Sequence, residues 1–232
     1  RLPRESDSFA IHSRLRADRA TATATGTGAC RRVPTTGWLH YGNDLGGSRF
    51  SVAAQINPSN VRELERAWTY HTGDLSVALG FEATPLMVND TLYLCTPRNI
   101  IIALDPDSGK QRWVFNPNSR LPPTGTCRGV SYYKVPDATG ACAERIIFGT
   151  VDARLMALDA ASGQPCDAFG VKGVVNLWDG LGPVRPGYYF ITSAPTIVNG
   201  TTGQLRVSIP GQPADLLAGE YSDTVTIELT PN

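Results

Sequence analysis

The sequence predicts an all-β protein assembled from repeated sheets. From Thr36 onward, short runs of β-branched and aromatic residues alternate with Asp, Asn, Gly and Pro, which is typical of strands joined by tight turns. A segment of nineteen residues recurs without a gap 54 positions later, and part of a third copy follows at an offset of 110. Repeats of this length bury their faces only against neighbouring repeats, which favours a β-propeller.

Composition and charge exclude several classes of function. The chain has 232 residues, of which 41% are hydrophobic, and its 21 basic residues balance 21 acidic ones. A formal net charge of zero gives no electrostatic basis for binding nucleic acid or an anionic membrane surface. The longest apolar runs resemble IIIAL at 100–104, far below the ~20 residues that a membrane span needs. We therefore expect no transmembrane segment in this chain.

Residues 1–36 are rich in Arg, Thr, Ala and Gly and contain few large apolar residues. This composition predicts a disordered leader. A basic arm for an acidic partner is the alternative, but the sustained basic density of such arms is missing.

Neither the histidines nor the cysteines indicate a metal site. His12, His40 and His71 are far apart, and none has a second ligand type at helical spacing. The five cysteines, of which Cys30 is the first, show neither CxxC spacing nor the density of a small disulfide scaffold.

The first predicted elements precede the repeat and open it. The run VRELERAW at 61–68 has apolar residues at helical spacing, so we expect one short helix or turn there. A strand is predicted at 84–88 (TPLMV) and another at 111–115 (QRWVF). With two strands between them, they make four short antiparallel strands, the size of one propeller blade.

The repeat itself aligns TLYLCTPRNIIIALDPDSG at 91–109 with RIIFGTVDARLMALDAASG at 145–163. Each copy reads as two strands ending in Ala-Leu-Asp, followed by a turn that a glycine closes, at Asp105–Gly109 and Asp159–Gly163. Asp and Ser side chains can bond the turn backbone, and Gly supplies the position with positive φ. Both copies therefore predict the same hairpin and turn.

A third copy begins with SAPTIVNG at 193–200, which aligns with ATPLMVND at 83–90. Fewer than three blades cannot close a ring, so the sequence predicts a partial β-propeller over 37–200. Residues 201–232 do not continue the repeat, although 221–229 alternates like one strand. We describe 201–232 as a divergent β tail, and a gene fusion, a frameshifted or truncated reading and a divergent blade all remain open as its origin.

Several motifs carry a family resemblance. TGWLHYGNDLGGSRFSVAAQINPSNVRELERAWTYHTGD at 36–74 resembles the opening segment of dehydrogenases that depend on pyrroloquinoline quinone (PQQ), with the pattern W..YG.D..G.R.S....I...NV..L..AW....G. FEATPLMVNDTLYLCT, TCRGVSYY and ITSAPTIVNG then follow in family order. The resemblance covers about 37–199 and is strongest to membrane-bound quinoprotein glucose and quinate/shikimate dehydrogenases.

The resemblance implies a fold and an activity. It implies an eight-bladed propeller that binds PQQ on its axis, oxidises an alcohol carbon of a polyol or cyclitol, and passes the electrons to a membrane quinone. The parent enzyme would act at the periplasmic face of the bacterial inner membrane, and it would hold Ca²⁺ through ligands that are not in this chain. As a lone chain, the protein is expected to be inactive.

Four cofactor contacts are implied by the same resemblance: Glu82 in FEATP, Arg128 in CRGVSY, Thr192 in TSAP and, less closely matched, Thr150 in FGTVDARL. PQQ is an anionic tricarboxylate with an ortho-quinone, so a guanidinium and nearby hydroxyl donors suit it. Without the resemblance, Arg128 could simply pair with an acidic neighbour, Glu82 could bond a turn, and the threonines could be ordinary strand hydroxyls.

The chain also departs from the family pattern. The family's catalytic Asp and calcium ligands lie in later blades, so we assign no catalytic residue and no metal ligand here. Tyr133 stands where glucose-type relatives tend to have a histidine, and GNDLGGSRFS is more similar to the quinate type, so both features lean away from glucose.

Two further cysteines bear on the compartment. Cys127 and Cys142 flank a loop where related membrane-bound quinoproteins also have cysteines. A disulfide between them is allowed if the domain faces the periplasm, although their spacing alone does not imply it.

Two other functions stay open. A non-catalytic propeller module for protein interaction in the cell envelope would have the same ALDxxSG turns, but it would have no use for Glu82 together with Arg128. A secreted adhesin-like strand protein rests only on the tail, which is similar to the last strand of pilin-like subunits. The Glu82–Arg128 pair therefore discriminates between an enzyme and a binding module.

Overall fold

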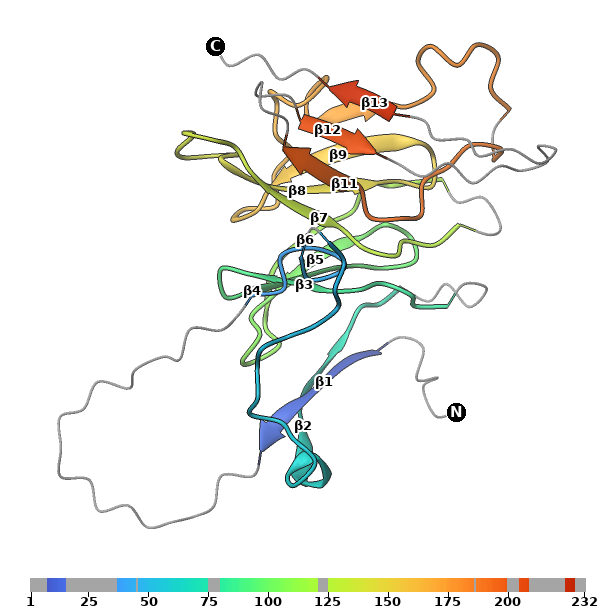
Figure 1. Ribbon diagram of the computed structural model, residues 1–232. Coiled ribbons are helices and arrows are strands. Elements are labelled where there is room, and N and C mark those ends of the chain that lie inside the picture. The colour runs from blue at the N-terminus through green and yellow to red at the C-terminus, as the bar shows by residue number, and fades with distance from the viewer. Residues whose placement is uncertain are drawn as a thin grey trace.

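The computed structural model describes residues 8–15, 37–44, 46–74, 80–120, 125–185, 187–199, 205–208 and 224–227. These residues form four antiparallel sheets, which follow one another through the molecule in chain order (Figure 1). Within these ranges the one helical element is the 3₁₀ turn η2 (Val61–Glu63), so the all-β prediction is confirmed. None of the described residues forms a helix that is long and apolar enough to cross a membrane.

The first sheet pairs β1 (Ser8–Leu15) with β2 (Leu64–His71). Our expectation of disorder across 1–36 is wrong for β1. The physical reason is visible in its sequence, because Phe9 and Ile11 alternate with small or polar residues in the two-residue period of a strand. The rest of the expected leader lies outside the described residues.

The helix or turn expected at 61–68 is only partly confirmed. The turn is η2, but the chain is extended from Leu64 onward, and Trp68 lies in β2. Three apolar residues at helical spacing were too few to outweigh the strand pairing that β1 provides.

The second sheet, which we call blade one, has the order β3 (Leu86–Val88), β4 (Thr91–Cys95), β5 (Ile101–Leu104) and β6 (Gln111–Phe115). All three pairings are antiparallel. The four-stranded blade predicted for about 84–115 is confirmed, with its first strand two residues shorter than expected at its start.

The third sheet, blade two, contains β7 (Ser131–Lys134), β8 (Glu144–Gly149), β9 (Arg154–Asp159) and β10 (Val174–Asn176), again as an antiparallel meander. Its register copies that of blade one. Leu92 lies opposite Leu104 in blade one, and Ile146 lies opposite Leu158 in blade two, at the predicted offset of 54. The internal repeat is therefore confirmed at the level of individual residue pairs.

Successive sheets pack face to face, and the three hydrophobic cores lie between them. Alternate residues of β4 and β5 point to opposite cores: Leu92 and Leu94 belong to one, and Tyr93 and Cys95 to the next. Every residue of β4 and β5 is buried. This burial on both faces explains why β5 reads as the continuous apolar run IIAL instead of alternating.

Tryptophans from one sheet cover the glycine turns of the next. Trp68 in β2 donates from Nε1 to the carbonyl of Pro106 (2.9 Å), and a Cβ added at Gly109 would lie 2.5 Å from its ring. Trp113 in β6 donates to the carbonyl of Ala160 (3.0 Å) and covers Gly163 in the same way. Each turn therefore needs a glycine both for its positive φ and for the indole ring above it.

The fourth sheet has the order β11 (Thr196–Asn199), β12 (Leu205–Ser208) and β13 (Thr224–Ile227). β11 is the strand expected from the third copy of the repeat. β12 and β13 belong to the residues that we expected to form a separate tail, and β13 lies inside the predicted strand 221–229. The sheet thus crosses residue 200, and the domain boundaries that we gave stay a prediction.

Candidate functional site

Three of the four predicted site residues stand just before the first strands of three successive sheets. Glu82 precedes β3, Arg128 precedes β7 and Thr192 precedes β11, and these first strands contact one another in that order. The Arg128 N–H donates to the carbonyl of Thr192 (2.8 Å), and the Thr84 N–H donates to the carbonyl of Arg128 (2.9 Å). The repeat therefore brings equivalent positions of three sheets to one place.

The side chain of Arg128 bonds those of both Glu82 and Thr192, and we call these three residues the Arg128 cluster. Arg128 donates from Nε to Glu82 Oε2 (3.0 Å) and from Nη1 to Thr192 Oγ1 (2.7 Å). The Arg128 and Glu82 side chains are 39% and 47% exposed, whereas Thr192 is buried. Among the described residues Arg128 Nη2 has no partner, so a fixed guanidinium presents an open donor edge to solvent.

Thr150 is not brought into this cluster. It is fully buried, its hydroxyl donates to Asp152, and the same oxygen accepts the Arg154 N–H (3.0 Å). Burial raises the pKa of Asp152, but hydrogen bonds from Arg154 and Thr150 outweigh it, and the net pKa is lowered. The Thr150 carbonyl accepts a hydrogen bond from the N–H of Ile191, the residue before Thr192. Thr150 therefore supports the backbone next to the Arg128 cluster. Its direct contact with a cofactor stays a prediction.

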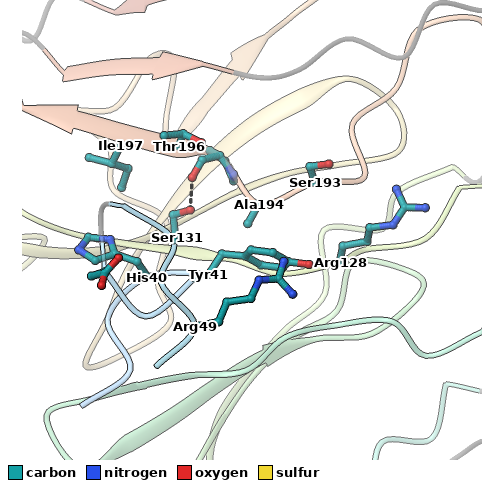
Figure 2. Close-up of a pocket in the computed structure, with 13 residues that line it drawn as sticks. His40, Tyr41, Arg49, Arg128, Ser131, Ser193, Ala194, Thr196 and Ile197 are labelled. Atoms are coloured by element: carbon teal, nitrogen blue, oxygen red, sulfur yellow. Dashed lines mark hydrogen bonds between the residues drawn. The ribbon is translucent and has the colours of Figure 1, made fainter. Parts of the chain in front are cut away.

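A pocket of about 350 Å³ opens beside Arg128, between the opening segment and the starts of β7 and β11 (Figure 2). The Ser131 hydroxyl donates to the carbonyl of Pro195 at its back, as the dashed line shows. The pocket is lined by His40, Tyr41, Gly42, Asp44, Gly47, Arg49, Arg128, Ser131, Ser193, Ala194, Pro195, Thr196 and Ile197. Half of its polar side chains, those of His40, Tyr41, Asp44 and Arg49, come from the opening segment, from which the sequence suggested no individual site residue.

Tyr41 and its neighbours organise this opening segment. The Arg49 guanidinium lies over the Tyr41 ring, 5.5 Å from the centroid. A Cβ at Gly129 would lie 3.4 Å from both Tyr41 and Ala194, so the backbone beside Arg128 is closely covered. Hydrogen bonds, first of all from Ser48, lower the pKa of Asp44. The motif YGND..G.R held the sequence signal for these residues, because it places aromatic and charged side chains in a glycine-rich loop.

The described residues contain no group of three or more His, Cys, Asp or Glu side chains arranged to hold a metal ion. Tyr133, which stands where glucose-type relatives tend to have a histidine, packs against the hydrophobic core that contains Ile147 and Leu155. It does not line the pocket.

The disulfides differ from the sequence-based expectation. Cys127 is bonded to Cys95, and Cys142 is bonded to Cys166. The suggested Cys127–Cys142 bridge is wrong because β7 lies between the two residues, so they leave the strand at opposite ends. Spacing along the chain could not show this.

Comparison with known proteins places these features in a family. Residues 38–206 match the family described as "PQQ: Glucose/ethanol/alcohol dehydrogenase, beta-propeller domain". Quinate/shikimate dehydrogenase (quinone) from Acinetobacter baylyi is 44% identical over 187 residues, which cover 71% of this chain and 23% of that protein. Quinoprotein glucose dehydrogenase from Escherichia coli is 38% identical over 195 residues, or 78% of this chain and 24% of that protein.

Solved structures agree. The quinohemoprotein alcohol dehydrogenase from Comamonas testosteroni superposes with a TM-score of 0.56 at 26% identity, covering 76% of this chain and 24% of that structure. The chain therefore spans about a quarter of the length of the relatives that it matches. By its repeats and these matches, the chain belongs to the β-propeller family of PQQ-dependent glucose, ethanol and alcohol dehydrogenases.

Proposed function

We propose that this chain forms part of the PQQ-binding site of a quinoprotein dehydrogenase, and that Arg128 provides its principal contact with the cofactor. The observation that carries this proposal is the Arg128 cluster, a guanidinium fixed on one edge by Glu82 and Thr192 and open on another. A propeller module that only bound proteins would not need this arrangement.

The residues present fit PQQ. An exposed guanidinium offers parallel N–H donors to carboxylate or quinone oxygens, and such charge-assisted bonds are the stronger ones. When bound, PQQ supplies the oxidation chemistry by accepting the hydride of an alcohol carbon. In this arrangement Arg128 would bind a carboxylate of PQQ or polarise its quinone oxygens, while Glu82 holds the guanidinium at Nε and Thr192 orients it at Nη1. We assign no residue of the chain as the acid–base group.

The substrate class that we propose is a polyol or cyclitol of the quinate/shikimate or glucose kind, with a membrane quinone as electron acceptor. The names of the relatives support this class, and a pocket with charged and hydroxyl-bearing side chains opens beside Arg128. We further propose that the complete enzyme holds Ca²⁺ through residues outside this chain and acts at the periplasmic face of the inner membrane. The two disulfides support an oxidising compartment of this kind.

The first prediction concerns binding. In an equilibrium titration of the purified chain with PQQ, followed by absorbance and fluorescence, we expect saturable binding that Arg128→Ala weakens at least tenfold, about 1.4 kcal/mol. The matched control is Arg112→Ala. Arg112 is also 39% exposed and also pairs with a carboxylate, at 3.1 Å, but it lies on β6. We expect this control to leave the affinity unchanged.

Two outcomes would count against the proposal. If the unaltered chain shows no saturable binding, the chain does not hold PQQ by itself. Equal losses in the Arg128 and Arg112 variants would show non-specific ionic attraction. Dye reduction with quinate or glucose is expected to be absent in the same samples, because acid–base groups must come from other blades.

A further inference from the structure

We infer that the Cys95–Cys127 disulfide is a positioning device for Arg128, and that it keeps the guanidinium in the orientation needed to bind the cofactor. This inference rests on the function proposed above. Cys127 is the residue directly before Arg128, and its partner Cys95 is the last residue of β4. The bridge therefore joins the core of blade one to the site.

The backbone around Arg128 needs support because it lies outside any strand. Residues 126–128 precede β7 and pass between the segment leading into β3 and the segment leading into β11. The Thr126 hydroxyl donates to the carbonyl of Gly80 (3.2 Å), and Arg128 bonds Thr84 and Thr192 through its own backbone. These bonds fix the strand direction, but each is a single contact with an irregular segment.

The bond from Nη1 to the buried Thr192 hydroxyl holds one edge of the Arg128 guanidinium, but the Glu82–Arg128 ion pair at Nε adds little to it. Both side chains are more than one-third exposed, and exposed ion pairs are weak because water and salt screen them. Cys127, by contrast, is 2% exposed and Cys95 is fully buried, within the core that also contains Tyr93, Ile146 and Phe148. Because neighbouring Cα atoms are about 3.8 Å apart, a covalent anchor at 127 leaves the Arg128 backbone little freedom to move.

The second disulfide provides a comparison within the same chain. Cys142–Cys166 closes a loop of similar length, with a sequence separation of 24 against 32, and its sulfurs are also held in a hydrophobic core. Cys142 lies before β8, on the far side of β7 from Arg128. Both bridges should stabilise the fold by similar amounts, so only a positioning role distinguishes them.

The test compares two double variants, Cys95→Ala/Cys127→Ala and Cys142→Ala/Cys166→Ala. The main readout is the exchange of the arginine Nε proton with solvent by ¹⁵N NMR, with the Arg128 signal assigned through Arg128→Lys. We expect exchange at Arg128 to accelerate at least tenfold when the Cys95–Cys127 bridge is removed, and less than twofold in the other variant. Equal exchange in both variants would overturn the inference.

PQQ affinity gives the second readout. We expect the affinity for PQQ to fall at least fivefold when the Cys95–Cys127 bridge is removed. Removing the bridge from the Arg128→Ala variant should lower the affinity no further, because the bridge acts only through the Arg128 side chain. If the unaltered chain does not bind PQQ, the proposed function fails for this chain, while the exchange measurement still decides the positioning role. If Cys95→Ala/Cys127→Ala does not fold, Cys95→Val/Cys127→Ala is used in its place, because valine fills the core better than alanine.

Thiol counting on denatured, unreduced protein is the necessary control. Four of the five cysteines are in disulfides, so at most one free thiol is expected. A count of five would contradict the Cys95–Cys127 pairing on which the inference depends, and a count of three would do so where the thiol label is found on Cys95 and Cys127.

Discussion

Blade one and blade two share one turn but use it differently. In both, the aspartate of ALDxxSG accepts two hydrogen bonds from the serine of the same motif, one from its backbone N–H and one from its hydroxyl. The acceptor is Asp105 Oδ1 for Ser108 and Asp159 Oδ1 for Ser162, and the distances are 2.7–2.9 Å. In both, a tryptophan of the preceding sheet covers the closing glycine. The repeat therefore conserves the contacts that each sheet makes within its turn and with its neighbour.

The difference lies in the second carboxylate oxygen. Asp105 Oδ2 pairs with Arg112 on the surface of β6 (3.1 Å), whereas Asp159 Oδ2 accepts the backbone N–H of Cys142 (2.6 Å). In blade two the same turn thus anchors a loop that the Cys142–Cys166 disulfide also holds. The packing contacts of the repeated turn are therefore the same in both blades, whereas its contacts with peripheral residues differ. This difference allows one blade to acquire a function that the other lacks.

The largest effect is expected at the covering tryptophans. Trp113→Ala should destabilise the chain by about 3–5 kcal/mol, because it removes a nearly buried indole and leaves a cavity between the blades. Trp68→Ala should cost less, since Trp68 is only half-buried. Urea unfolding measures both. A Trp68 loss that equals or exceeds the Trp113 loss would contradict this ranking, and Trp113→Phe serves if the alanine variant does not fold.

A smaller loss is expected at the closing glycines. Gly163→Ala should cost about 2–4 kcal/mol, combining backbone strain at a φ of 73° with a clash against the Trp113 ring. Gly140→Ala is the matched control. Its φ is 80°, but nothing lies within 4 Å of the added Cβ, so only backbone strain of about 1 kcal/mol remains. Equal unfolding midpoints for the two variants would show that the ring contact adds nothing.

The smallest effect is expected from pH. Hydrogen bonds from Ser108, followed by the Arg112 contact, lower the pKa of Asp105 from 3.8 to about 2. Because the folded-state pKa is depressed, the carboxylate stabilises the fold above about pH 4, and this contribution is lost as the pH falls towards 2.

Asp105→Asn should lower the free energy of unfolding by less than about 1 kcal/mol at pH 7, because solvent screens so exposed a group. Chemical unfolding should show that this loss becomes smaller between pH 7 and pH 2.5. Asp167→Asn, at an exposed position outside the turn, is the control. A difference that stays constant across this range would rule out a contribution from the charge.

Much of the fold could be predicted from the sequence because its signals are local and repeated. Two ungapped copies predicted the hairpins β4–β5 and β8–β9, and the structure shows that equivalent residues face each other in both. β1 was missed because its two-residue period is embedded in a composition typical of disorder, and only its partner β2, whose paired residues are 49 to 63 positions away, makes it a strand.

The site could be predicted only in part. Family motifs pointed to Glu82, Arg128 and Thr192, but their chemistry depends on contacts between residues 46 and 64 positions apart, which no local pattern encodes. Thr150 has the same residue type as Thr192, yet its hydroxyl is committed to its own turn. The cysteine partners follow from strand direction, which neither the spacing of the cysteines nor the family resemblance contains, so the pair that the resemblance suggested was wrong.

The carbonyl of Ala160 shows what the blade contact means for engineering. It accepts both the Tyr93 hydroxyl and the Trp113 N–H, each at 3.0 Å, so both of its lone pairs are used by the other blade. Surface turns are usually the places where a chain can be cut, extended or circularly permuted. The turn after β9 is closed to such changes, whereas Gly140, where an added Cβ would meet nothing within 4 Å, is where a new terminus or a fused domain belongs.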